Sequence, residues 1–138
     1  MTELRAVFRR SALSGDADRQ ILLAHPDALE LSDIAVMQGR TRVALDAGHI
    51  IGFATWADSA GAIEIEDLFV DPPWMGRGAG RALTEDLIRH ARGRGARRVE
   101  VTANQQAVGF YSRLGFVASQ QVQTRFGPAP RMHLELSP

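Results

Sequence analysis

Apolar residues recur at every second position in several short segments of the chain, and this period is typical of half-buried β-strands. The segment Leu4–Phe8 alternates around Ala6 and predicts a first strand. Two further strands, Thr41–Asp46 and His49–Trp56, flank Ala47-Gly48, a dipeptide that indicates a tight hairpin. Later strands are predicted at Ala62–Val70, Arg98–Thr102, Phe116–Gln123 and Arg131–Leu136.

Helical spacing of apolar residues predicts the elements between the later strands. Leu83, Leu87 and Ala91 repeat every four residues, which predicts a helix over residues 78–92. A second helix is predicted over Gln106–Leu114, where apolar residues stand at i, i+3, i+4 and i+7. Two shorter helices are predicted nearer the N-terminus: one through residues 21–24, with a cap at Ser14–Asp16, and one over Ile34–Met37, with a cap at Ser32-Asp33.

The resulting order of elements is βααβββαβαββ, which predicts an α+β or mixed α/β fold with a mixed central sheet and helices on both faces. The strand Ala62–Val70 leads through a helix to Arg98–Thr102, so these two strands are expected to be parallel, with a right-handed crossover. The length of 138 residues suits one domain, 1–138. Ligands in such sheets bind outside the carboxyl ends of the strands.

The composition excludes several classes of protein. Sixteen basic and sixteen acidic residues give a net charge of zero, which argues against a dedicated nucleic-acid-binding protein. The chain has no cysteine, which excludes a thiol nucleophile and a cysteine–zinc site, and its four histidines show no metal-ligand spacing. No apolar run approaches the roughly 18 residues of a membrane span, and the N-terminus has no signal-peptide core. We therefore expect a cytoplasmic protein that binds neither a membrane nor a metal ion.

Three glycines at alternate positions, Gly76, Gly78 and Gly80, lie between a double proline and a predicted helix. Glycines allow tight turns that bring successive N–H groups together, and the start of a helix adds unpaired N–H donors beside the positive end of its dipole. Pyrophosphate is the natural ligand of such a backbone site. A Walker A loop is excluded because Arg81 and Ala82 follow the last glycine, and a Rossmann fingerprint lacks its third glycine. A plain strand-to-helix turn is the alternative.

Two motifs give the chain a resemblance to the GNAT superfamily of acetyl-CoA-dependent N-acetyltransferases. The superfamily's central motif, Val-x-Pro followed after a short spacer by Gln/Arg-x-x-Gly-x-Gly/Ala, matches the segment 70–80. Its later motif, Asn-x-x-Ala-x-x-Phe-Tyr-x-x-x-Gly-Phe, matches the segment 104–116. The resemblance spans roughly residues 4–136, and its one clear departure is Met75, where Gln or Arg is usual.

The resemblance implies a strongly twisted, GNAT-like central sheet and acetyl-CoA as cofactor. The N–H groups of the glycine loop would hold the pyrophosphate, and the backbone of Leu68 and Val70 would pair with the pantetheine arm as an added strand. Asn104 is expected to bind the pantetheine, and the hydroxyl of Tyr111 to stabilise the departing thiolate. The implied cofactor-binding residues are Leu68, Phe69, Val70, Met75, Gly76, Arg77, Gly78, Ala79, Gly80, Arg81, Asn104, Phe110 and Tyr111.

Transfer of an acetyl group to an amine needs a base, because an aliphatic amine with a pKa of about 10.4 is almost all ammonium at neutral pH. Glu64 and Glu66 lie on the same face of their predicted strand. The segment 65–70 is similar to the Leu-Glu-Asp-Phe-Phe-Val of spermidine/spermine acetyltransferases, whose base matches Glu66, whereas histone acetyltransferases place the base at the position of Glu64. We expect Glu66 to be the base, with Glu64 or a water chain as alternatives, and exposed strand charges as a third possibility.

The acceptor site has no recognisable motif. We expect it to involve Trp56, Glu64, Glu66, Arg125 and Phe126 and to take a small-molecule amine or a peptide. The leading hypothesis is direct attack by a primary amine in a ternary complex, without a covalent acyl-enzyme, in a monomer or homodimer. A protein lysine or N-terminal acetyltransferase and a non-catalytic regulatory module that binds acetyl-CoA are the alternatives.

Several predicted site residues also have a purely structural interpretation. Asn104 is compatible with capping of the following helix, and Tyr111 with a place in the core. Arg77 and Arg81 fit solvated charges at the start of a helix. Trp74, beside two prolines, fits packing better than function.

Overall fold

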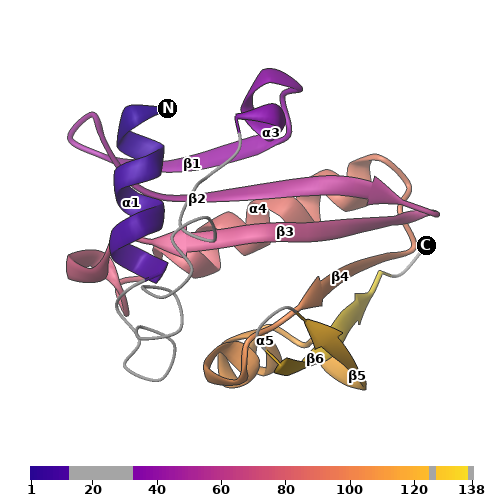
Figure 1. Ribbon diagram of the computed structural model, residues 1–138. Helices are drawn as coiled ribbons and strands as arrows, with labels where there is room; N and C mark the ends of the chain where they lie inside the picture. The colour runs from indigo at the N-terminus through magenta and orange to yellow at the C-terminus, as the bar shows by residue number, and fades with distance from the viewer. Residues whose placement is uncertain (13–32, 125–126, 137–138) are drawn as a thin grey trace. The chain divides into compact units, whose positions relative to one another are not determined.

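The computed structural model describes residues 1–12, 33–124 and 127–136 (Figure 1). Their strands form a mixed sheet in the order β1-β2-β3-β4-β6-β5, which confirms the predicted α+β class. The chain divides into two compact units. The first unit is Met1–Thr55 with Asp67–Thr84, and the second is Trp56–Glu66 with Glu85–Pro138. No helix among the described residues is long and apolar enough to cross a membrane.

The prediction of a strand at Leu4–Phe8 is wrong, because these residues belong to a helix, α1 (Thr2–Ala12). Leu4, Val7 and Phe8 are its buried residues, and their i, i+3, i+4 spacing is that of one helical face. Leu4 and Phe8 also fit an alternating pattern, but the burial of Val7 between them is incompatible with a strand that has one buried face. The three side chains form a core cluster with Phe53 of β2 (His49–Ser59) in the first unit.

The predicted hairpin is confirmed in the first unit. β1 (Thr41–Asp46) pairs antiparallel with β2, and Asp46 lies opposite His49. The two loop residues, Ala47 and Gly48, have φ of 49° and 82°, the left-handed values that a two-residue type I′ turn requires at both positions. The short helix α3 (Ile34–Met37) precedes this hairpin as predicted, although Asp33 makes no side-chain capping bond. The helix predicted through residues 21–24 lies outside the described residues.

The predicted parallel pair is also confirmed. β3 (Ala62–Val70) pairs in parallel with β4 (Arg98–Thr102), from Ala62 opposite Arg98 to Ile65 opposite Val101. The helix α4 (Ala79–Gly93) connects the two strands and buries Leu83, Leu87 and Ala91 at the predicted four-residue spacing. The C-terminal part adds η3 (Gln105–Ala107), α5 (Val108–Arg113), β5 (Val117–Thr124) and β6 (Gly127–Glu135).

The last strand, β6, begins at Gly127, earlier than the predicted start at Arg131. Pro128 and Pro130 conceal this part of the strand in the sequence, because proline cannot donate to a ladder. The carbonyl of Pro130 accepts a hydrogen bond of 2.9 Å from the N–H of Ala103, just past the last β4 residue. The N–H and C=O of one residue face the same edge of a strand, so the N–H that Pro130 lacks would point to the position just past the end of β4. No ladder hydrogen bond with a β4 residue is therefore lost there.

Candidate functional site

The glycine loop, residues 75–78, joins η2 (Pro72–Trp74) to α4 in the first unit. Gly76 and Gly78 have φ of 77° and 90°, a region that L side chains rarely adopt. A Cβ built on either glycine would meet no atom within 4 Å. The two glycines are therefore required by the path of the backbone and not by crowding, and both lie open to solvent.

Backbone donors gather where this loop enters the helix. The N–H of Ala82 donates to the carbonyl of Gly78 at 2.9 Å, and this bond begins the helical ladder of α4. The N–H groups of Ala79 and Gly80 precede it and point out of the helix end, where the positive end of the dipole lies. Such an arrangement of donors is suited to the binding of an anion.

The side chains of the loop differ in their contacts. The Arg77 guanidinium lies 5.4 Å from the centre of the Trp74 ring, a cation–π contact that keeps this charge beside the loop. Trp74 therefore has the packing role expected of it. Met75, at the position where the GNAT pattern has Gln or Arg, is 44% exposed, and Arg81 is exposed at the first turn of α4.

An ion pair that the sequence analysis missed anchors the start of the loop. The guanidinium of Arg10, in α1, donates two hydrogen bonds to the carboxylate of Asp71, at 2.8 and 2.7 Å. These bonds raise the pKa of Arg10, with burial acting in the opposite direction. The N–H of Asp71 donates to the carbonyl of Ile51 at 2.8 Å, which fixes the same residue to β2. One sequence offers no signal that pairs residues so far apart.

The end of β3, where the pantetheine contacts are predicted, is shaped by close packing in the first unit. Phe69 packs edge-on against Phe8 of α1 at 4.8 Å between ring centres. A Cβ on Gly52 would lie 3.0 Å from the carbonyl oxygen of Phe69, so glycine is needed there for β2 to approach β3. Leu68 and Val70 alternate with Phe69 and face the other side of the strand. Among the described pairings, β3 and β4 pair only as far as Ile65, which leaves the later peptide groups of that β3 edge without a partner in β4.

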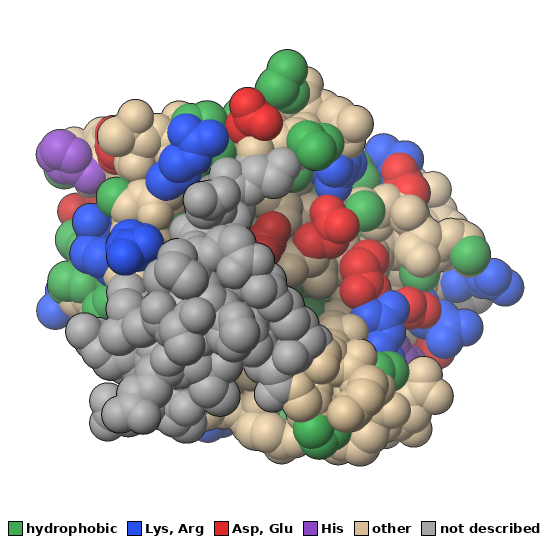
Figure 2. Space-filling model, viewed as in Figure 1, with side chains coloured by type: hydrophobic (Ala, Val, Ile, Leu, Met, Phe, Trp, Pro, Cys, Tyr) green, Lys and Arg blue, Asp and Glu red, His purple; other side chains and the backbone are tan. Residues whose placement is uncertain are grey.

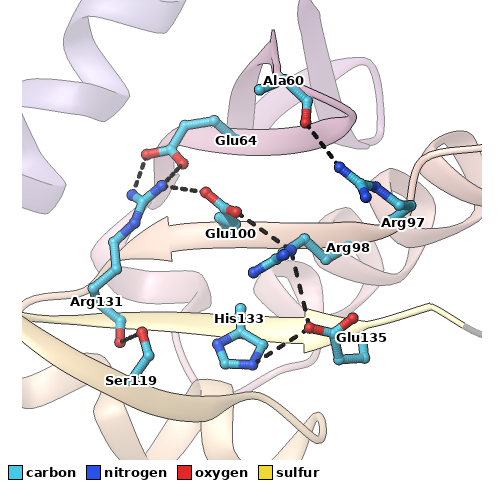
Figure 3. Close-up of polar contacts among 9 residues, drawn as sticks. All are labelled: Ala60, Glu64, Arg97, Arg98, Glu100, Ser119, Arg131, His133 and Glu135. Atoms are coloured by element: carbon cyan, nitrogen blue, oxygen red, sulfur yellow. Dashed lines mark hydrogen bonds and ion pairs between the residues drawn. The ribbon is translucent and has the colours of Figure 1, made fainter.

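The first of the two candidate bases, Glu64, is held by an arginine in the second unit (Figure 3). Arg131 of β6 donates from Nη1 to Glu64 Oε1 at 2.6 Å and from Nη2 to Glu64 Oε2 at 2.5 Å. The same Nη2 donates to Glu100 at 2.5 Å, and Nη1 donates to Thr102 at 2.9 Å. The bonds to Glu64 are the main reason that the pKa of Arg131 is raised. Both oxygens of Glu64 are thus occupied as acceptors.

The second candidate base, Glu66, lies further along β3 and is exposed. It follows Ile65, the last β3 residue paired with β4. The neighbouring Asp67 faces the other side of the strand, where Thr55 donates a hydrogen bond of 2.5 Å to its carboxylate. Of the three carboxylates on β3, at positions 64, 66 and 67, that of Glu66 is the most open to solvent.

Asn104 and Tyr111 occupy the positions that their structural interpretations predict. The Asn104 side chain accepts a hydrogen bond of 2.9 Å from the N–H of Ala107 and caps η3. Tyr111 is 4% exposed, and its ring lies 5.1 Å from that of Phe110 and 5.3 Å from that of Phe116. This burial raises the pKa of the Tyr111 phenol well above its ordinary value. The phenol therefore keeps its proton, while the amide nitrogen of Asn104 is not used by the cap.

Of the residues predicted for the acceptor site, Glu64 and Glu66 lie two residues apart on β3, and Trp56 is on β2. Trp56 is 5% exposed and packs against α4, with its ring 4.4 Å from His90 and 5.3 Å from the Arg94 guanidinium. This position gives Trp56 a clear role in packing. Arg125 and Phe126 lie outside the described residues.

A groove in the second unit, with a volume of about 430 Å³, contains none of the predicted site residues. Its lining residues are Glu85, Ile88, Arg89, Arg92, Leu114 and Leu134.

Figure 2 shows arginine and carboxylate side chains next to each other on the face in view. The described residues contain no group of three or more His, Asp or Glu side chains that could hold a metal ion.

Comparison with known proteins identifies the group to which this arrangement belongs. The sequence profile described as "Acetyltransferase (GNAT) family" matches residues 10–116. A glucosamine 6-phosphate N-acetyltransferase from Trypanosoma brucei brucei is 31% identical over 106 residues, covering 67% of this chain and 72% of that protein. A GCN5-related N-acetyltransferase from Rhodopseudomonas palustris superimposes with a TM-score of 0.78 at 26% identity, covering 98% of this chain and 89% of the other.

A shorter match shows how the lengths of these proteins differ. An uncharacterised N-acetyltransferase from Methanocaldococcus jannaschii is 44% identical over 63 residues, which is 44% of this chain and 28% of that protein. The chain spans less than a third of that relative's length.

Proposed function

The chain belongs to the GNAT family of acetyltransferases, and from this premise we propose that it transfers the acetyl group of acetyl-CoA to a primary amine by direct attack in a ternary complex. The observation that carries the proposal is the glycine loop. Its two left-handed glycines, Gly76 and Gly78, lead directly into the N-terminus of α4. Such a loop suits a pyrophosphate, because it offers N–H donors without side chains in the way.

The donor molecule would meet three parts of the chain in turn. The N–H groups of residues 76–81 bind the pyrophosphate, with Arg77 and Arg81 beside the outer phosphates. The unpaired edge of β3 at Leu68–Val70 binds the pantetheine arm through backbone hydrogen bonds. The amide of Asn104 donates to the same arm while its carbonyl oxygen caps η3. A backbone N–H near Phe69 or Val70 bonds to the thioester oxygen.

In the proposed reaction, Glu66 acts as the base. It takes a proton from the acceptor ammonium, directly or through water, and the neutral nitrogen then forms the new C–N bond as the C–S bond breaks. The second proton that the nitrogen loses on becoming an amide passes to the departing thiolate, which leaves as the thiol of CoA. Tyr111 donates a hydrogen bond to the departing sulfur, and burial, which raises the pKa of its phenol, keeps the hydroxyl protonated. The exposure of Glu66 on β3, together with the two hydrogen bonds that Arg131 donates to Glu64, supports Glu66 as the base.

A small-molecule acceptor is favoured over a protein acceptor. The relative that matches along most of its length, from Trypanosoma brucei brucei, is named for a small amino sugar. The experiment is a screen of small amines and lysine-containing peptides with acetyl-CoA, read by thiol release and by the mass of the product. The chain contains no cysteine, so every thiol that is detected comes from the cofactor. Tight binding of acetyl-CoA with no amine consumed would instead support a regulatory binding module.

A further inference from the structure

Four side chains on β3, β4 and β6 form what we call the carboxylate–guanidinium cluster: Glu64, Glu100, Thr102 and Arg131; Figure 3 draws all of them except Thr102. Glu64 lies directly opposite Glu100 in the parallel pair, so two carboxylates share one face of adjacent strands. Arg131 lies between them and donates four hydrogen bonds from its two terminal nitrogens. Each of these nitrogens carries two hydrogens, so all four are used.

Because these four hydrogens are engaged within the cluster, Arg131 has little capacity to hydrogen-bond a ligand. A guanidinium with its terminal hydrogens engaged offers only its Nε to an anionic substrate group. Its effect on a ligand is therefore the charge that it contributes to the cluster. Arg98 lies 3.6 Å from the other oxygen of Glu100, so two carboxylates face two guanidiniums, whereas the same site without Arg131 would carry one more negative charge.

The position of the cluster connects it to the proposed chemistry. Glu66 stands two residues after Glu64 and on the same face of β3, about 7 Å along the strand. This separation is within the screening length of about 8 Å at physiological ionic strength, so a cation bound at Glu66 experiences the charge of the cluster. The three charged side chains of the cluster are 21–23% exposed, which reduces screening further.

We propose that Arg131 is a specificity-determining residue that selects acceptors by the number of positive charges they carry. This inference rests on the proposed function, with Glu66 as the base. By cancelling one of the two carboxylates beside Glu66, Arg131 favours an acceptor with a single ammonium group. A second ammonium on a polyamine would meet a site whose charge is already largely balanced.

The test compares two acceptors of equal carbon chain, butylamine and 1,4-diaminobutane, at pH 8. In Arg131→Gln, the ratio of kcat/KM for the diamine to kcat/KM for the monoamine should rise about 3- to 10-fold, because the second ammonium gains one more Coulomb attraction. Arg131→Lys keeps the charge and should restore the wild-type ratio. Glu100→Gln removes one carboxylate and should lower the ratio.

The control is Arg89→Gln, which changes the net charge by the same amount at a side chain that is 67% exposed and pairs only weakly with Asp86. It should leave the ratio unchanged. If Arg131→Gln does not fold, the opposite shift in Glu100→Gln tests the same idea with an isosteric change. An unchanged ratio in both variants, or an equal change in Arg131→Lys and Arg131→Gln, overturns this inference alone. No transfer by the wild-type protein to any amine overturns the proposed function and this inference with it.

Discussion

The guanidinium of Arg10 donates two hydrogen bonds, of 2.8 and 2.7 Å, to the carboxylate of Asp71 across 61 residues of sequence. Asp71 is 9% exposed and stands immediately before η2 and the glycine loop. The pair therefore joins the last turn of α1 to the entrance of the proposed pyrophosphate site. Its loss should affect both the stability of the protein and the binding of acetyl-CoA.

Arg10→Gln should lower the free energy of unfolding by about 1–3 kcal/mol, because it leaves the buried Asp71 carboxylate without its cation. The lower half of this range is expected, since the Arg10 side chain is 52% exposed. Urea denaturation gives this value, and calorimetry should show weaker acetyl-CoA binding. Arg9→Gln, one residue earlier on the same helix and exposed, is the matched control. Equal losses in the two variants would show that only net charge matters.

Gly78→Glu should abolish acetyl-CoA binding in calorimetry while the far-ultraviolet circular dichroism stays unchanged. The substitution forces a side chain into a backbone with φ of 90° and places a negative charge at the expected pyrophosphate position. Gly93→Glu adds the same side chain at the other end of α4, where a Cβ meets no atom within 4 Å, and should bind acetyl-CoA normally. Unaltered affinity in Gly78→Glu would rule out the glycine loop as the cofactor site.

Tyr111→Phe should lower kcat about 10- to 1000-fold with little change in acetyl-CoA affinity, because it removes the donor to the departing sulfur. The ring packing against Phe110 and Phe116 is retained, so stability should change little. Steady-state kinetics with a responsive amine and thermal denaturation provide the two measurements. An unchanged kcat would leave Tyr111 as a residue of the core only.

The ionisation of Tyr111 is directly observable, because it is the one tyrosine in the sequence. Burial raises the pKa of its phenol, whereas in the unfolded chain the phenol ionises at about pH 10. Stability from this group is thus complete below pH 10 and is lost as the pH rises beyond it. Tyrosinate absorbance should remain absent from the native protein at pH 10 and appear at that pH in denaturant. A native midpoint close to 10 would contradict burial of the hydroxyl.

Glu66→Gln should lower kcat/KM most near pH 7 and progressively less toward pH 9–10, where more of the acceptor is already the free amine. Glu64→Gln should have a smaller effect, since both Glu64 oxygens are held by Arg131. The pH–rate profiles of the two variants and the wild type provide the comparison. Profiles that stay parallel across this range would exclude both carboxylates as the base.

Periodic patterns predicted the local elements well where they were long and unambiguous. The hairpin at Ala47-Gly48, the parallel pair of β3 and β4, and α4 follow from alternation, glycine positions and four-residue spacing, and all three are confirmed. The prediction failed for Leu4–Phe8, because five residues fit both periods and only tertiary burial of Val7 distinguishes them. Two prolines concealed the start of β6, because whether a strand tolerates a proline depends on where the neighbouring strand ends.

The sequence by itself determined the glycine loop, the family motifs and the candidate residues, because backbone conformation and short-range motifs are properties of neighbours along the chain. Tertiary structure alone decided which charges meet. It paired Arg10 with Asp71 and placed Arg131 against Glu64 and Glu100, and it left Glu66 exposed to solvent. The physical reason is that an ion pair requires only that two side chains lie close together in a suitable geometry. The pairs described above are 61 and 67 positions apart, and no local sequence pattern indicates that residues so far apart are in contact.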